Sequence, residues 1–235
     1  MKNYFLNSIE KIHILQNIYL KNKFFFKKKT YSMHGEDLVL EKYFKEIDNG
    51  FYVDLGCYHP IQYNNTNLLY QKGWRGINID INEFSVKLFN FCRPDDLNLN
   101  LAVSDKNGEI DFYYQKKLSL LSTIKKSQCN FAFQGKINKK KISSQTLTKV
   151  LDDSKYKDKQ IDFLDIDIEG ADLDALKSLD FSRYSPKLIC VEILHENMFT
   201  SSNDIDKSDI YNLLKTKNYK KIWSGVFNHI FVKNP

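Results

Sequence analysis

The segment Phe51-Tyr-Val-Asp-Leu-Gly-Cys57 is the best starting point for predicting the fold. Its apolar residues run with little alternation, which is typical of a strand buried on both faces of a parallel sheet. Asp54 lies near the end of this strand, and Gly56 opens a turn in which the backbone can approach a ligand closely. Residues 58–60 are Tyr-His-Pro rather than glycines, which disfavours a pyrophosphate-binding turn. Taken alone, the segment fits a structural turn equally well.

Strand-like and helix-like segments alternate along the rest of the chain. Strands are predicted over 51–57, 75–80, 97–104, 161–168, 187–194, 219–224 and 229–233, and helices over 65–72, 83–91, 146–151, 172–179 and 206–218. Residues 225–228 make a short hairpin connection between the last two strands. This order predicts an α/β, doubly wound, Rossmann-like sheet that ends in an antiparallel hairpin. Residues 115–144, rich in Lys, Ser and Gln, are expected to be an insertion that covers a site.

The composition is that of an ordinary globular protein. The chain has 235 residues, of which 42% are hydrophobic, 27% charged and 14% aromatic, and this aromatic content excludes intrinsic disorder. The four cysteines form no C-x-x-C pair, so a disulfide scaffold is disfavoured and a reducing, cytoplasmic location is expected.

The positive charge is concentrated at the N-terminus. Residues 1–30 hold seven lysines and one glutamate (7 − 1 = +6), whereas residues 31–235 hold 28 basic and 28 acidic side chains. The main domain, 31–235, is therefore neutral, and no nucleic-acid partner is expected. Apolar residues at helical spacing predict that 1–30 is a basic amphipathic helical extension. Two alternatives stay open: peripheral contact with an anionic membrane, or packing on the main domain or on a second subunit of a homo-oligomer, which the apolar stripe favours.

A second motif, Trp74-Arg-Gly-Ile-Asn-Ile-Asp80, is another apolar strand that ends in an acid. Asp80 follows Gly56 by 24 residues. A carboxylate at this place in a doubly wound sheet can accept hydrogen bonds from the hydroxyl groups of a ribose. The alternative is that Asp80 belongs only to the cap of the helix that follows.

A third motif, Ile161-Asp-Phe-Leu-Asp-Ile-Asp-Ile-Glu-Gly170, carries three alternating acids, Asp165, Asp167 and Glu169. Alternation on a strand predicts that all three point to one face. Such a cluster is costly when buried unless it binds a cation or hydrogen-bond donors, and capping of the helix over 172–179 accounts for only one of them. Three acids at this place indicate a functional site.

In the fourth motif, Glu192 and His195 follow the next predicted strand, beside these acids. A histidine next to an acid cluster is well placed to take a proton. His59, after the first strand, is a second and poorer candidate for a base.

Eight ordered motifs make the sequence similar to the FkbM family of S-adenosylmethionine-dependent methyltransferases. The opening Ser32-Met-His-Gly-Glu-Asp37 resembles the S-Q-x-G-E-D of that family, with Met33 in place of glutamine. The other similar segments are 50–56, 73–80, Arg93-Pro94, 100–104, Ser122-Thr123, 161–170 and 186–192. The resemblance implies the seven-stranded class I methyltransferase sheet, S-adenosylmethionine as cofactor and, from the habits of the family, O-methylation of sugars or natural-product hydroxyls. A nucleotide-linked sugar used for bacterial surface polysaccharides, such as a capsule, is the expected substrate.

The resemblance also implies roles for individual residues. The methionine portion of the cofactor would contact Asp54, Gly56 and Cys57, with Glu36 nearby and Asp165 approaching the amine. The ribose would bind Asp80, with Ile81 beside it. The adenine would lie between Ala102, Val103 and Ser104.

Two routes would remove the proton of the accepting hydroxyl group. In one, His195 is a general base oriented by Glu192 or Asp167. In the other, Asp167, Glu169 and Glu192, with or without His195, hold Mg²⁺ or Mn²⁺, which lowers the pKa of the hydroxyl group.

Two rival functions stay in view. A nicotinamide-dependent sugar oxidoreductase would need the glycine-rich turn that is missing after Asp54. A non-catalytic, membrane-apposed assembly protein is suggested by residues 1–30 and opposed by the intact acids.

Overall fold

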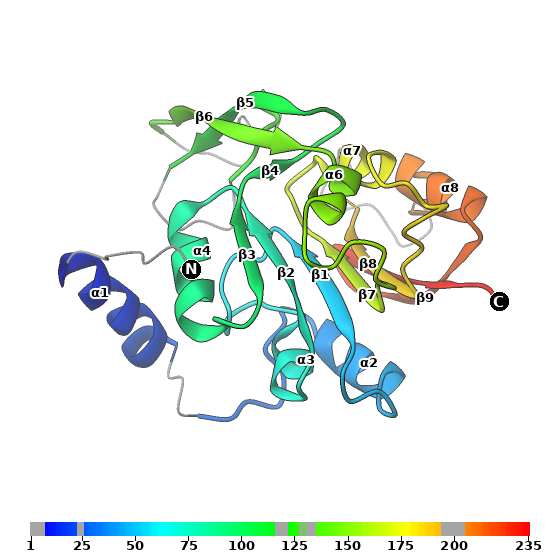
Figure 1. Ribbon diagram of the computed structural model, residues 1–235, viewed down its shortest axis with the longest axis horizontal. Helices are drawn as coiled ribbons and strands as arrows, with labels where there is room; N and C mark the ends of the chain where they lie inside the picture. The colour runs from blue at the N-terminus through cyan, green and yellow to red at the C-terminus, as the bar shows by residue number, and fades with distance from the viewer. Residues whose placement is uncertain (1–7, 23–25, 116–121, 127–128, 130–134, 194–204) are drawn as a thin grey trace.

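The computed structural model describes residues 8–22, 26–115, 122–126, 129, 135–193 and 205–235. Its main feature is a seven-stranded sheet of order β3-β2-β1-β7-β8-β10-β9 (Figure 1). The strands are β1 (Phe51–Leu55), β2 (Arg75–Asp80), β3 (Leu97–Asn100), β7 (Phe163–Ile166), β8 (Leu188–Glu192), β9 (Tyr219–Ser224) and β10 (Asn228–Lys233). The first five are parallel, and β10 runs antiparallel to both β8 and β9. The predicted doubly wound sheet with a C-terminal hairpin is confirmed.

Helices cover both faces of the sheet. They are α1 (Ser8–Leu15), the π-helical η1 (Gln16–Lys21), α2 (Glu36–Tyr43), α3 (Asn67–Gln71), α4 (Glu83–Cys92), α6 (Leu147–Asp152), α7 (Asp172–Lys177), the 3₁₀ turn η3 (Ile205–Lys207) and α8 (Asp209–Thr216). Side-chain oxygens of Asn82, Thr146 and Ser208 accept backbone hydrogen bonds at the starts of α4, α6 and α8, which satisfies otherwise unpaired donors.

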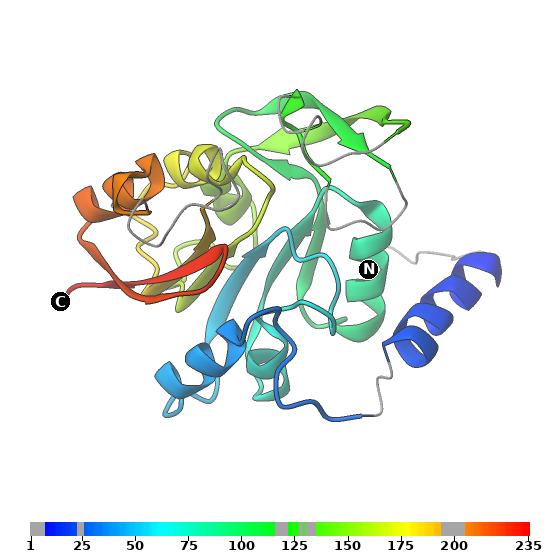
Figure 2. The same cartoon turned by 180° about the vertical axis from the view of Figure 1, so that it is seen from behind.

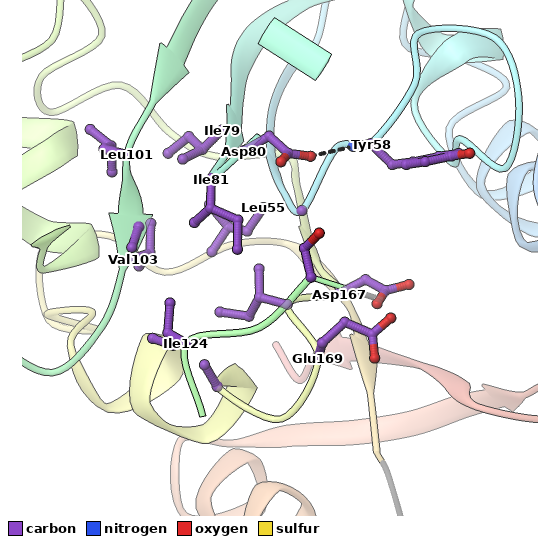
Figure 3. Close-up of a pocket in the computed structure, with 15 residues that line it drawn as sticks. Leu55, Tyr58, Ile79, Asp80, Ile81, Leu101, Val103, Ile124, Asp167 and Glu169 are labelled. Atoms are coloured by element: carbon purple, nitrogen blue, oxygen red, sulfur yellow. Dashed lines mark hydrogen bonds between the residues drawn. The ribbon is translucent and has the colours of Figure 1, made fainter. Parts of the chain in front are cut away.

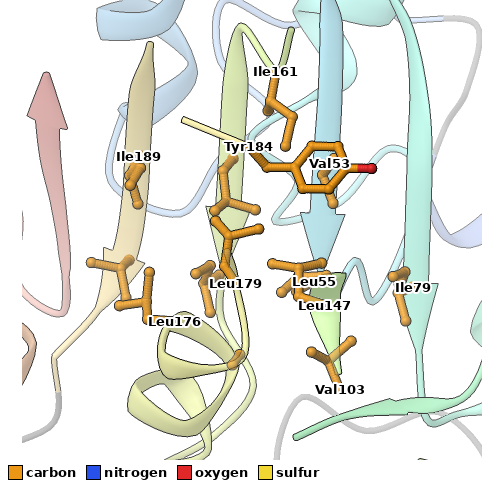
Figure 4. Close-up of a cluster of buried hydrophobic side chains, with 14 of the residues drawn as sticks. Val53, Leu55, Ile79, Val103, Leu147, Ile161, Leu176, Leu179, Tyr184 and Ile189 are labelled. Carbon is orange, nitrogen blue, oxygen red and sulfur yellow. The ribbon is translucent and has the colours of Figure 1, made fainter. Parts of the chain in front are cut away.

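Strand alternation separates an apolar face from a face that carries acids. Val53, Leu55 and Ile79 pack against Leu147 and Leu176 from the helices α6 and α7 (Figure 4). The opposite face presents residues such as Tyr52 and Phe163, which pack with Leu40 of α2 and Leu69 of α3. Because successive side chains point to opposite faces, Asp54 and Asp165 share this second face. The acids of β1 and β7 are therefore directed away from the larger core.

A second sheet of order β4-β6-β5 corrects two predictions. The strand predicted over 97–104 breaks at Leu101, so that only β3 joins the main sheet and β4 (Ala102–Val103) pairs with β6 (Asn138–Gln145). The strand β5 (Gly108–Tyr114) was not predicted, and β6 lies in the region expected to be a connection. In β6 only Ile142 and Ser144 are buried, so the strand carries little apolar pattern that sequence reasoning can detect.

The N-terminal helical segment packs on the main domain through one face. Ile14 and Ile18 are buried with Leu88 of α4, and the ammonium group of Lys87 lies 2.6 Å from a carboxylate oxygen of Glu10. Figure 2 shows α1 beside α4 at the edge of the molecule. Within the described ranges, no helix is both long enough and apolar enough to span a membrane.

Candidate active site

A pocket lies at the carboxyl ends of β1, β2 and β7 (Figure 3). Apolar side chains, including Leu101, Val103 and Ile124, line one end, and Asp167 and Glu169 line the other. Including its open mouth, the space measures about 530 Å³. An apolar end and an acidic end suit a ligand with a flat apolar group and a cationic group.

The carboxylate of Asp80 is held in one orientation between these two ends. Its Oδ1 accepts a hydrogen bond from the backbone N–H of Asn82 at 2.7 Å. Its Oδ2 accepts from the backbone N–H of Tyr58 at 2.8 Å and from the hydroxyl group of Ser85 at 3.1 Å. A carboxylate has about four acceptor positions, so Oδ1 keeps one for a ligand hydroxyl group. Burial raises the pKa of Asp80, and the three hydrogen bonds lower it. Burial is the larger effect, so the pKa is raised to about 6.

The turn after β1 lies directly against the turn after β7. Gly56 has a φ of +78°, and the backbone N–H groups of Gly56 and Cys57 both donate to the carbonyl oxygen of Ile79. A Cβ on Gly56 would lie 1.8 Å from the carbonyl oxygen of Asp167. Only glycine combines this left-handed conformation with so close a backbone contact. Any residue other than glycine at position 56 would therefore collide with the backbone of Asp167.

The acids of the third motif are divided between a strand and a turn. β7 ends at Ile166, so Asp165 lies in the strand, whereas Asp167 and Glu169 lie in the turn that follows. The prediction of three alternating strand residues is therefore wrong for Asp167 and Glu169. Glu169 has a φ of +53°, which reverses the chain, and its carbonyl oxygen accepts a hydrogen bond from the hydroxyl group of Thr123.

Neither acid of this turn is used to hold the turn itself. Asp172 does that, because its two carboxylate oxygens accept from the backbone N–H groups of Ile168 and Gly170. Burial, followed by the repulsion of neighbouring carboxylates, raises the pKa of Asp167 to about 7 and that of Glu169 to about 8. Both side chains therefore stay available to a ligand.

Glu192, at the end of β8, has one buried carboxylate oxygen that lacks a donor in the described part of the chain. No hydrogen-bond donor reaches its Oε2 among the residues that the structure describes. Burial raises its pKa most, followed by the charges of Asp167, Asp172 and Glu169. Asn228 faces it on β10 and likewise has an unpaired Oδ1 within the described ranges. This edge of the sheet therefore presents acceptors that lack donors, which is costly unless a ligand supplies them.

Five of the ten predicted cofactor residues line the pocket: Gly56, Asp80, Ile81, Ala102 and Val103. The other five, namely Glu36, Asp54, Cys57, Ser104 and Asp165, do not line it. All five are buried. Four of them form side-chain hydrogen bonds, and the thiol of Cys57 is the exception. The pairs are Glu36 with the backbone N–H of His34, Asp54 with Thr66, Asp165 with Asn65, and Ser104 with Ser144. Burial raises the pKa of Asp54 to about 6 and that of the Cys57 thiol well above its ordinary value.

Arg93 joins the loop after β1 to the start of α3, a role that the sequence analysis missed. Its guanidinium group is buried and donates to Thr66 Oγ1 at 2.8 Å, to Asn64 Oδ1 at 2.7 Å and to the carbonyl oxygen of Pro60 at 2.8 Å. Thr66 in turn donates to Asp54 at 2.7 Å. The Arg93-Pro94 pair was noted only as part of a motif, since sequence alone does not show that an arginine is buried.

His59 has a structural role, which contradicts its prediction as a second base. Its Nδ1 accepts from the backbone N–H groups of Ile61 and Gln62, both at 3.0 Å, and its Nε2 lies 3.1 Å from Asn17 Oδ1. Burial lowers its pKa to about 3. The ring is therefore a neutral link between the N-terminal segment and the main domain, and no nitrogen is left for a substrate proton.

Two further predictions concern His195 and a metal ion. His195 lies outside the described residues. In the described part of the chain, no group of three or more His, Cys, Asp or Glu side chains is arranged to hold a metal ion. Asp167, Glu169 and Glu192 therefore do not form a coordination site there.

The strand order of the sheet and its C-terminal hairpin are those that the resemblance to S-adenosylmethionine-dependent methyltransferases implies. A family model, the methyltransferase FkbM domain, matches residues 54–221, more than half of the chain. The chain therefore belongs to the FkbM methyltransferase family. This membership disfavours the nicotinamide-dependent alternative.

No curated protein matches the chain. A TehB-like S-adenosylmethionine-dependent methyltransferase from Corynebacterium glutamicum is similar in structure, with a TM-score of 0.45 and 8% identity over 97% of this chain and 98% of that one.

The residues of the pocket fit S-adenosylmethionine. The apolar end would take the adenine, the free acceptor position of Asp80 would take a ribose hydroxyl group, and Asp167 and Glu169 would lie near the cationic methionine portion. The fit rests on the two-ended lining of the pocket.

Proposed function

We propose that this methyltransferase modifies a hydroxyl oxygen of a sugar, within a nucleotide-linked sugar or a polysaccharide precursor. The observation that carries the proposal is the buried Oε2 of Glu192, which has no hydrogen-bond donor among the residues that the structure describes. It lies near Asp167, which lines the pocket. Acceptors without donors favour a neutral sugar ring rich in O–H groups at this place, whereas they would repel the phosphate groups of the same substrate there. The choice of a sugar is supported by the family resemblance.

The protein must align the substrate oxygen and remove its proton. When bound, S-adenosylmethionine supplies a methyl group on a positively charged sulfur. An alcohol is a poor nucleophile because its pKa lies far above neutral, so a base must accept the proton as the oxygen–carbon bond forms. His195 is the proposed base, with Glu192 and Asp167 as the groups that orient it. A pKa of about 7 would let Asp167 take the proton instead.

Incubation with labelled S-adenosylmethionine and a panel of nucleotide sugars tests this function. Transfer of label to one sugar, with mass spectrometry locating the methyl group on oxygen, would support it. Binding of S-adenosylhomocysteine without transfer to any sugar of the panel would contradict the substrate class. The same reactions with a chelator test the metal route: activity lost in chelator and restored by Mg²⁺ or Mn²⁺ supports it, and full activity in chelator excludes it.

Variants separate the candidates for the base. We expect His195→Gln to lower turnover by about 100-fold with unchanged affinity for S-adenosylhomocysteine, and Glu192→Gln to lower it by about 10-fold. His13→Gln, in the exposed part of α1, is the matched control. If His195→Gln keeps full turnover and Asp167→Asn abolishes it, Asp167 is the base.

A further inference from the structure

The N-terminal segment has an apolar face that nothing in the described structure covers. Ile9, Ile12 and Leu20 are 66%, 61% and 74% exposed, on the side of α1 and η1 away from the buried Ile14 and Ile18. Leu15 and Phe26 are exposed as well. These five side chains are nearly half of the twelve large apolar residues exposed among the described residues. So dense a group on a short segment marks an interaction surface.

The same segment is strongly basic. Lys11, Lys21 and the run Lys27–Lys28–Lys29 are exposed, and no ion pair is formed by their ammonium groups within the described residues. Glu10, the one acid between residues 8 and 29, lies against Lys87. Because residues 31–235 are formally neutral, the attraction to an anionic partner is concentrated on this segment.

We propose that α1, η1 and residues 26–29, here called the basic-apolar face, bind the surface of an anionic lipid membrane. Helices with apolar side chains beside lysines lie in the plane of the interface, where the apolar groups enter the headgroup boundary and the lysines meet anionic lipids. The contacts of Ile14, Ile18 and Glu10 with α4 hold the helix to the body. The whole domain would therefore be held at the membrane.

Charge favours lipid over a second copy of the chain. A two-fold dimer pairs the same surface on both subunits. Five lysines would then face five lysines, and the one acid of the segment, Glu10, is already paired with Lys87. An anionic bilayer removes this repulsion and buries the same apolar side chains. The proposal uses none of the residues of the methyltransferase site, so its test does not depend on the proposed substrate.

Vesicle flotation with the full chain tests the proposal. Phosphatidylcholine vesicles are compared with vesicles that also contain about 30% phosphatidylglycerol. We expect at least about fivefold more protein on the anionic vesicles, with most of it released at ~0.5 M salt. No binding, or equal binding to both kinds of vesicle, would overturn the proposal.

Two variants separate the apolar contribution to membrane binding from the electrostatic one, and a third variant is the control. The variant Ile9→Ser/Ile12→Ser/Leu20→Ser removes apolar groups, and Lys27→Gln/Lys28→Gln/Lys29→Gln removes three charges; each should lower binding at least about fivefold. The control Lys139→Gln/Lys140→Gln/Lys141→Gln removes three consecutive exposed lysines of β6 and should keep it. Circular dichroism confirms that each variant is folded. An equal loss in the control, or a dimer in sedimentation that the serine variant dissociates, would overturn the proposal.

Discussion

Gly56 and Asp167 touch through their backbones, since a Cβ on Gly56 would lie 1.8 Å from the carbonyl oxygen of Asp167. The contact joins the turn after β1 to the turn that carries the acids of the pocket. Gly56→Ala must therefore displace one of the two turns. We expect at least a tenfold loss of affinity for S-adenosylhomocysteine by calorimetry, and a loss of stability of about 3 kcal/mol from backbone strain and overpacking together.

Gly135→Ala is the matched control for this prediction. Gly135 has a φ of +89°, close to that of Gly56, but no atom lies within 4 Å of its added Cβ. The Gly135→Ala variant should lose only about 1–2 kcal/mol of stability, from backbone strain. Its affinity for S-adenosylhomocysteine should be unchanged. Equal losses in the two variants would show that the contact with Asp167 is unimportant.

Asp80 should contribute to cofactor binding through its one remaining acceptor position. Asp80→Asn replaces one carboxylate oxygen by an amide that repels the backbone N–H groups of Tyr58 or Asn82. We expect affinity for S-adenosylhomocysteine to fall by about 10- to 100-fold, as measured by calorimetry.

Asp96→Asn provides the comparison for Asp80→Asn. Asp96 is as buried as Asp80 and also accepts a backbone hydrogen bond, from Gly76 at 2.8 Å, but it does not line the pocket. This variant should lose stability and keep its cofactor affinity within about threefold. A similar fall in affinity for both would mean that the effect of Asp80 is general destabilisation.

The stability of the ligand-free protein should fall as the pH rises from about 6 to 8.5. The pKa values of Asp167 and Glu169 are raised to about 7 and about 8 in the folded protein, whereas the unfolded chain has their ordinary values near 4. The folded state therefore binds more protons over this range. The stabilisation is complete below the unfolded pKa and is lost as the pH passes the folded pKa.

Thermal unfolding at several pH values measures this effect. We expect the Tm to be lower at about pH 8.5 than at about pH 6, and Asp167→Asn/Glu169→Gln to flatten the profile. A wild-type Tm that rises over the same interval would contradict the raised pKa values.

Arg93 should be needed for stability although it does not line the pocket. A lysine cannot reach Thr66, Asn64 and the carbonyl oxygen of Pro60 together, so Arg93→Lys leaves buried acceptors unpaired. We expect a loss of about 3 kcal/mol in the free energy of unfolding, measured with urea. Arg183→Lys changes an arginine that binds Asp152 at the surface and should cost less than about 1 kcal/mol. Equal costs would contradict the role assigned to the buried network.

Much of the main sheet could be predicted because its evidence is local. Four of the five parallel strands, β1, β2, β7 and β8, are largely apolar runs, and their burial can be predicted without knowledge of distant residues. The acid at the end of β2 follows from the position of Asp80 in its run. The strand β6 could not be predicted in this way, because most of its side chains face solvent and only its pairing with β4 and β5 defines it.

The amino-acid order alone is thus sufficient to predict the α/β architecture, the family resemblance and the edge of the sheet at which the pocket lies. The reason is that periodicity and apolar runs report burial. Tertiary structure alone separates the residues that line the pocket from the buried residues that do not. Asp165 binds Asn65, 100 residues away, and His59 is occupied by two backbone amides and Asn17. Hydrogen-bond partners of this kind depend on which chain segments come into contact in the folded protein. A local sequence pattern does not predict such contacts between distant segments.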